Sequence, residues 1–217
     1  MPNHCNNALL VQGPKVELNR FFNSCIREEL GDGSKRIPSE FYIDFNRLVP
    51  LPEDATNSDR SDLWGTKWNS YSCNQLFLPR SLGDNRVLFT FDTAWSPPLR
   101  TFFNGSRLYP NLVFTMLSFE QSNGFASIYQ IKNNEFIYKN VDSPEMVELC
   151  NNVMGPVDPN ESLGDGNDRI KEKVMPQLNK MPIEIKNIIL LMLFVNKSGT
   201  DNYEATIPPT PLNLIGE

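Results

Sequence analysis

The sequence feature that most constrains the fold is the stretch Val87-Leu-Phe-Thr-Phe-Asp-Thr-Ala-Trp-Ser-Pro-Pro98. Its first half is rich in β-branched and aromatic residues, which predicts a strand over Val87–Thr93. Proline fits the first turn of a helix because no partner is lost with its missing N–H. Pro97-Pro98 therefore predicts a helix over Pro97–Leu108, with Ser96 as its N-cap. A strand that leads directly into a helix indicates helices layered on a sheet.

The beginning of the chain has the same order of strand and helix. Ala8–Gln12 is a continuous apolar run, which predicts a short strand buried on both faces. An amphipathic helix is then predicted over Lys15–Leu30. Its apolar stripe consists of Leu18, Phe21, Phe22, Cys25 and Ile26. We expect Leu18 and Phe22 to pack against Phe89, where the helix meets the sheet.

Further strands complete a sheet around these two units. The sequence predicts a strand over Phe41–Phe45, a polar loop over residues 53–63 and a strand over Leu112–Phe119. A hairpin of Phe125–Ile131 and Glu135–Tyr138 is expected to turn at Asn133-Asn134. This order predicts an α+β fold of the ferredoxin-like type, a split βαβ antiparallel sheet with two helices. We expect it over residues 1–139, with a Trp-rich loop inserted at about residues 53–86.

Residues 140–217 have a different character. Ser143-Pro144 predicts the start of a helix that ends at Met154, and a second helix is expected over Asp168–Lys180. Ile183–Val195 predicts a third helix that is apolar around its circumference and needs cover on every side. We expect it to pack on the ferredoxin-like domain, with a homo-oligomer through residues 183–195 as the alternative. An extended tail is expected from Asn196.

The acidic residues are concentrated in this C-terminal region. The chain has a net charge of -6, and residues 1–139 carry 14 Lys/Arg and 14 Asp/Glu. The whole acidic excess therefore belongs to residues 140–217. A general nucleic-acid-binding protein needs a basic footprint, so this distribution argues against that class. The acidic region fits a solubilising surface or a face for a basic partner.

The cysteines and the apolar runs bear on cofactors and location. No metal-ligand spacing occurs among the four cysteines, Cys5, Cys25, Cys73 and Cys150, so we expect no iron–sulfur cluster and no other cofactor. Scattered cysteines without a signal-peptide pattern are typical of reduced thiols, which predicts a cytoplasmic protein. The longest apolar run, Ile188–Val195, is too short to span a bilayer.

Three ordered motifs carry a family resemblance: Met1-Pro-Asn-His-Cys-Asn-Asn-Ala-Leu-Leu-Val-Gln-Gly-Pro14, Trp64-Gly-Thr-Lys-Trp68 and Phe91-Asp-Thr-Ala-Trp-Ser-Pro-Pro98. Residues 1 to about 131 resemble the YubB-like ferredoxin-like domain of phage and plasmid proteins. The chain departs from the family at His4, where tryptophan is usual, and at Ser127, where glycine is frequent. The resemblance implies a ferredoxin-like shape and a mobile-element origin, and it implies no activity.

The tryptophan motifs supply the candidate binding residues. Trp64 and Trp68 are four residues apart, so one helical turn would place both indoles on one face with Lys67 between them. Such an aromatic platform with a cation could stack a base or hold a peptide. The alternative is that both indoles pack over the sheet. We expect Trp64 or Trp68 to lie near Trp95, with Asp92 beside it.

Asp92 and His4 are the candidates for chemistry. Asp92 fits a turn-capping carboxylate, and no second carboxylate or histidine stands at a spacing that would make it a catalytic acid. His4 is the only histidine, and with Cys5 it offers two metal ligands at the start of the chain, too few for a strong site. We therefore assign no catalytic and no metal-binding residue.

Binding is the favoured activity, and an enzyme is the weaker hypothesis. We expect a phage or plasmid accessory protein that binds a host protein, such as a defence or regulatory component. The alternative is a nucleic-acid-binding or nucleic-acid-processing module that uses the sheet and the Trp64–Trp68 segment.

Overall fold

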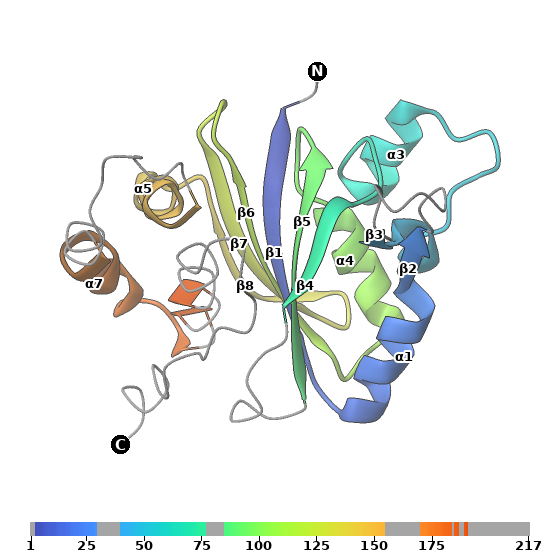
Figure 1. The fold of residues 1–217 in the computed structure, drawn as a ribbon, viewed down its shortest axis with the longest axis horizontal. Helices are drawn as coiled ribbons and strands as arrows, with labels where there is room; N and C mark the ends of the chain where they lie inside the picture. Colours follow the sequence, from blue (N-terminus) through green and yellow to red (C-terminus); the bar gives the residue numbers. More distant parts are fainter. Residues whose placement is uncertain are drawn as a thin grey trace, which may run out of the picture.

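A computed structural model describes residues 3–29, 40–76, 85–154, 170–183, 185–186 and 189–190 (Figure 1). The expected tail from Asn196 and the end of the expected helix Ile183–Val195 lie outside these residues. The strands are β1 His4–Gln12, β2 Ile26–Glu29, β3 Glu40–Ile43, β4 Tyr71–Leu76, β5 Arg86–Ala94, β6 Val113–Glu120, β7 Phe125–Lys132 and β8 Glu135–Val141. The helices are α1 Lys15–Cys25, α2 Phe45–Leu48, α3 Asn57–Trp64, α4 Leu99–Gly105, the 3-10 turn η2 Ser106–Leu108, α5 Pro144–Met154, the π-helical turn η3 Ile170–Val174 and α7 Met175–Leu178.

The strands form one sheet in the order β2-β3-β4-β5-β1-β6-β7-β8, and each neighbouring pair is antiparallel. The six strands from β4 to β8 form the main part, and the β2–β3 hairpin joins it through the pair Phe41 and Cys73. In the centre, β1 runs beside β5 from His4 opposite Ala94 to Gln12 opposite Arg86. The expected α+β class with an antiparallel sheet is confirmed.

One face of the sheet, called here the first face, is covered by α1, α2 and α4 (Figure 1). Its buried cluster joins Leu9 of β1 and Phe89 of β5 to Phe21 of α1 and Phe102 of α4. Phe21 contacts Phe89 with ring centroids 6.5 Å apart and contacts Phe114 at 5.6 Å, both edge to face. Aromatic residues dominate this core, and edge-to-face packing stabilises it beyond the area that it buries.

The opposite face, called here the second face, is covered by the C-terminal helices α5 and α7 (Figure 1). Ala8 and Leu10 of β1 lie in one buried cluster with Met146 of α5 and with Ile185 and Ile189. This cover on both sides explains why β1 is continuously apolar rather than alternating. Among the described residues of the expected helix 183–195, the two buried isoleucines therefore pack on this domain.

The first helix differs from the prediction. It ends at Cys25, and residues 26–29 form β2 instead of a last turn. The residue that fills the core is Phe21, which is fully buried, whereas Phe22 is 38% exposed. The expectation that Phe22 is buried was wrong because the α1 stripe that meets the sheet runs through Leu18, Phe21 and Cys25.

Capping residues account for three further differences. Phe45 does not end a strand but opens α2, because the Asp44 side chain accepts a hydrogen bond from the Asn46 amide. The segment expected as a polar loop contains α3, whose capping box pairs Thr56 with Asp59. Ser96 is not the N-cap of α4, which begins after Pro98 without a side-chain cap. By contrast, the predicted hairpin turn at Asn133-Asn134 is confirmed, with both residues at positive φ.

Candidate functional site

Trp64 is part of the core rather than of the surface. Its side chain is 4% exposed, packs edge to face on Phe45 and donates a hydrogen bond from Nε1 to the Val49 carbonyl at 2.8 Å. A buried indole needs a partner for its N–H, and Val49 provides it. The packing alternative therefore describes Trp64, which is removed from the candidate binding surface.

The helix α3 ends at Trp64 with Gly65 as its C-cap, so Trp68 does not share a helical face with Trp64. Gly65 has a φ of 87°, in the left-handed region that favours glycine at a helix end. A side chain at this position would have its Cβ 3.0 Å from the Pro97 carbonyl oxygen. This close approach brings the first tryptophan motif against the second one.

Hydrogen bonds fix the two motifs to one another. The Thr66 hydroxyl donates to the Ala94 carbonyl at 2.9 Å, and the Ser96 hydroxyl donates to the Gly65 carbonyl at 2.6 Å. The start of the chain joins them, because the Trp95 amide donates to the Asn3 carbonyl at 3.0 Å. The first residues of β1, the segment after α3 and the end of β5 thus meet at one end of the sheet.

Trp95 has an unusual backbone at this meeting point. Its φ is 71°, a conformation that is a genuine outlier for a bulky residue. The turn around it is held by the bond to Asn3, by the Ser96 amide donating to the Ala94 carbonyl and by the Thr93 hydroxyl donating to the Ser96 carbonyl at 2.9 Å. Its indole is nevertheless 44% exposed. A strained backbone thus carries a half-exposed tryptophan.

Lys67 lies beside this exposed indole, and Trp68 follows Lys67 in the chain. The Lys67 ammonium is 5.6 Å from the centroid of the Trp95 ring, a cation–π geometry. Trp68 is 43% exposed, and its ring is edge to face with Tyr71 at 6.3 Å. Lys67 belongs to none of the ion pairs found among the described residues. Within the described residues, a cation without an ion-pair partner therefore lies against the half-exposed Trp95 indole.

A small polar network adjoins the tryptophans on the second face. The Tyr71 hydroxyl and His4 Nδ1 are 2.9 Å apart, and Asn6 Nδ2 donates to the Asp92 carboxylate at 2.7 Å. Tyr71 and Asp92 are paired residues of β4 and β5. Burial raises the pKa of Tyr71, and the nearby negative charge of Asp92 raises it further, so its hydroxyl stays protonated at neutral pH.

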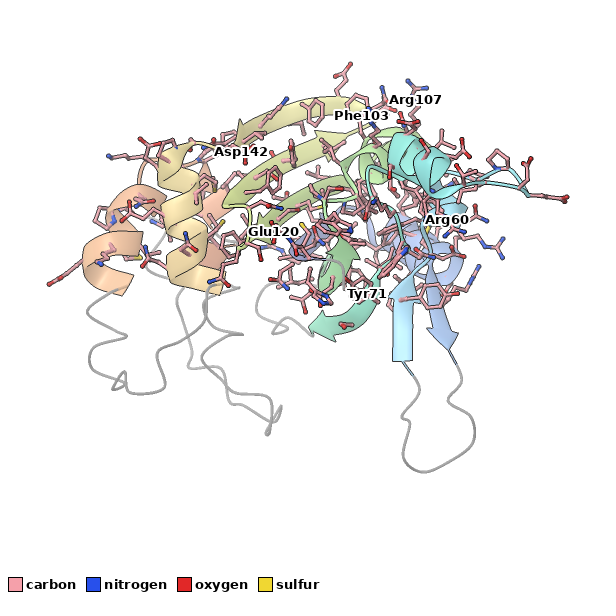
Figure 2. All side chains as sticks on the ribbon, turned by 90° about the horizontal axis from the view of Figure 1, so that it is seen from above. Arg60, Tyr71, Phe103, Arg107, Glu120 and Asp142 are labelled. Atoms are coloured by element: carbon pink, nitrogen blue, oxygen red, sulfur yellow. The ribbon has the colours of Figure 1, made fainter. Side chains whose placement is uncertain are left out.

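We call the residues His4, Lys67, Trp68, Tyr71, Asp92 and Trp95 the Trp68–Trp95 surface. Figure 2 shows Tyr71 well apart from the helices that cover the rest of the second face. Lys67, Trp68, Asp92 and Trp95 were candidates from the sequence, whereas Tyr71 and its contact with His4 were not expected. No spacing signal could have found them, because β4 was hidden inside the expected loop and strand pairing alone places Tyr71 beside Asp92.

This surface offers exposed aromatic side chains and a small polar network to a ligand. Asp92 is held by Asn6, and no group of three His, Cys, Asp or Glu side chains among the described residues could hold a metal ion. His4 and Cys5 do not converge, because successive residues of a strand point to opposite faces. Burial also raises the pKa of the Cys5 thiol to about 12, which leaves it protonated and unreactive at neutral pH.

The second face of the sheet is not an open platform. Leu117, Phe119 and Ile128 on this face are buried with Leu149 and Leu178 of the C-terminal helices. A sheet that stacks bases needs exposed aromatic residues on its free face. Within the described residues, exposed tryptophans occur at the end of the sheet instead. No helix of the described part of the chain is long and apolar enough to cross a membrane.

Comparisons with known proteins place the chain in no family. No family model matches the sequence, and no curated protein matches it. Among solved structures, the chain is similar to the protein api92 from Yersinia pseudotuberculosis, whose crystal structure is described with the family model DUF1281. The identity is 11% and the TM-score is 0.47, with 66% of this chain and 99% of that chain covered.

Proposed function

We propose that this protein acts by binding a host protein through the Trp68–Trp95 surface, as a cytoplasmic accessory protein of a phage or plasmid. The observation that carries the proposal is Trp95, which is half exposed although its backbone is in a strained conformation. Strain of this kind costs about 1–3 kcal/mol and clusters at ligand-binding sites. A residue without a surface role could avoid the cost by being glycine or asparagine.

The composition of the surface supports a protein partner. Tryptophan and tyrosine are enriched among the residues that dominate protein–protein binding energies, and the surface contains half-exposed Trp95 and half-exposed Trp68, which packs on Tyr71. The turn that carries Trp95 is fixed by hydrogen bonds before any partner arrives, which reduces the entropy lost on binding. An inhibitor or regulator of a host defence component needs only such a surface.

The three sequence motifs behind the family resemblance lie together in the structure. The three motifs that resemble the YubB-like domain contain Asn3 and His4, then Gly65 to Trp68, and then Thr93 to Ser96, and these segments are hydrogen-bonded at one place. A ferredoxin-like plan is further supported by the order β4-β5-β1-β6, with α1 following β1 and α4 between β5 and β6. Family membership and mobile-element origin are proposals on this basis.

Nucleic acid is the alternative ligand, because Lys67 against the Trp95 indole also suits a base and its phosphate. The chain carries a net charge of -6, and the second face is covered, so at the Trp68–Trp95 surface a nucleic acid would meet Lys67 rather than a basic groove. These two observations make a protein the favoured partner.

Affinity capture from a host lysate tests the proposal with matched variants. The tagged full chain should retain one host protein in stoichiometric amount, and nuclease treatment should not release it. The double variant W68A/W95G should lose it by about thirtyfold or more, the effect of a binding hot spot. The control V16S changes a side chain that is 81% exposed on α1 and should bind normally. Capture that survives the double variant, or that nuclease abolishes, would refute it.

A further inference from the structure

A second exposed apolar surface lies at the opposite end of the sheet. Three of the eight exposed large hydrophobic side chains of the described residues belong to it, namely Leu108, Phe136 and Ile137. Phe136 of β8 is paired with Ile131 of β7, Ile131 with Phe114 of β6, and Phe114 with Val11 of β1. Val11 lies near the end of β1 that is opposite to His4. The surface therefore does not touch the Trp68–Trp95 surface. Large apolar groups that gather in one place on a protein surface usually mark a contact site.

A β-bulge exposes two consecutive side chains here. The register of β7 and β8 shifts between the pairs Gln130–Tyr138 and Ile131–Phe136, so Ile137 is the extra residue. In a regular strand one of two successive side chains would turn inward. Instead Phe136 is 41% exposed and Ile137 is 55% exposed. Bulges re-aim side chains in this way, and they also prevent a regular strand from pairing with the free edge.

The exposed ring of Phe136 packs on two other aromatic rings. It stacks on Phe103 of α4 with centroids 4.7 Å apart and an interplanar angle of 26°, and it lies 5.8 Å from the Tyr129 ring. The Asn134 amide donates to the Ser106 hydroxyl at 2.7 Å, which ties the hairpin turn to η2 and its Leu108. The apolar group is thus rigid, and a partner would lose little entropy by ordering it.

Two cations flank this apolar centre. The Lys139 ammonium is 5.7 Å from the centroid of the Phe136 ring, and Arg107 precedes the exposed Leu108 on η2. Figure 2 shows Arg107 next to Phe103 at this corner of the molecule. Neither cation belongs to an ion pair within the described residues. On a chain with a net charge of -6, such a corner is locally basic.

We propose that this corner, called the Phe136 patch and formed by Phe103, Arg107, Leu108, Phe136, Ile137 and Lys139, docks an acidic amphipathic segment of a partner protein. Apolar side chains of the segment would cover Phe136 and Ile137, and its carboxylates would face Lys139 and Arg107. Charge complementarity of this kind sets orientation and speeds association, while the apolar centre holds the complex. The acidic excess of residues 140–217 would repel the same segment, which favours its approach to this corner.

Fluorescence anisotropy with a labelled peptide of alternating leucine and glutamate tests the proposal on the full chain. A matched peptide of leucine and lysine is the control ligand. The wild-type protein should bind the acidic peptide at least tenfold more tightly than the basic one, and R107E/K139E should abolish this preference. I137S should weaken binding of the acidic peptide about tenfold, the factor that 1.4 kcal/mol of lost contact produces. W95G should bind the peptide normally.

Three outcomes would overturn the proposal. They are equal binding of the two peptides, an unchanged preference in R107E/K139E, and a dimer in sedimentation that I137S disperses. The last result would assign the patch to a second copy of the chain. Urea unfolding confirms that each variant is folded, and if I137S unfolds, the charge variant alone decides. Because W95G leaves the Phe136 patch intact, failure of this proposal and failure of the Trp68–Trp95 surface are distinguishable.

Discussion

Replacing Trp95 by alanine and by glycine separates its strain from its role in binding. Both substitutions remove the same indole and the same contacts, so they differ only in the backbone. At a φ of 71°, alanine is in the left-handed region, which costs about 1–2 kcal/mol, whereas glycine adopts it freely. Glycine is otherwise the less stable residue by about 0.5–1 kcal/mol. We expect W95G to be more stable than W95A by about 1 kcal/mol.

Urea unfolding measures the difference, because the midpoints shift while the slope stays constant. The control pair is V16A and V16G on the exposed face of α1, where glycine should be the less stable by about 1 kcal/mol. The sign of the difference between glycine and alanine is therefore expected to invert between positions 95 and 16. If W95A equals or exceeds W95G in stability, the backbone of Trp95 is not strained and the observation behind the proposed function is lost.

Three further predictions concern the core and the thiols. F21A should lower the free energy of unfolding by about 3–5 kcal/mol and F22A by much less, since only Phe21 is fully buried. Equal losses in urea unfolding would contradict the placement of Phe21, rather than Phe22, in the buried stripe of α1. I189A should cost about 2–5 kcal/mol, and a loss below 1 kcal/mol would mean that the C-terminal helices do not complete the core of the second face. Burial raises the pKa of Cys5, Cys73 and Cys150 from 9.0 to about 12, so the folded state holds these protons more tightly than the unfolded state. The contribution of these thiols to the stability should therefore be constant below about pH 8, and the stability should fall between pH 9 and pH 12. No native thiol should react with a disulfide reagent at pH 8. A labelled thiol or a flat alkaline profile would contradict this prediction.

The sequence predicted those elements whose signal is local. The apolar run of β1, the strand before Trp95, the hairpin turn at Asn133-Asn134 and the helix after Ser143 all follow from periodicity or turn chemistry within a few residues. The hydroxyl of Ser143 accepts a hydrogen bond from the Met146 amide at 3.1 Å, as an N-cap does. Local signals of this kind do not depend on the rest of the fold.

The errors arose where tertiary contacts decide between local alternatives. Phe21 and Phe22 both fit an amphipathic stripe, and only the angle at which α1 crosses the sheet selects Phe21. Thr56 and Asp59 form a capping box, but no apolar periodicity follows them, so α3 gave no helical pattern. The stretch from residue 53 to residue 86 therefore looked like a loop although it contains α3 and β4.

The sequence pointed to some residues of the candidate site and not to others, because tertiary contacts also decide which side chains meet there. Tryptophans attract notice in any sequence, and Lys67 does lie against Trp95. The sequence could not separate buried Trp64 from exposed Trp68, because Gly65 reverses the chain between them. The polar partner Tyr71 depends on the pairing of β4 with β5, which has no local signature.

Site-specific photo-crosslinking tests the central claim most directly. A benzophenone amino acid is placed at position 68 of the full chain, and in a second variant at position 16, before exposure to light in host lysate. We predict one protein adduct from position 68, resistant to nuclease, and none from position 16. Equal labelling from both positions, no adduct from position 68 while wild-type protein captures a partner, or an adduct that nuclease removes would contradict binding of a host protein at the Trp68–Trp95 surface.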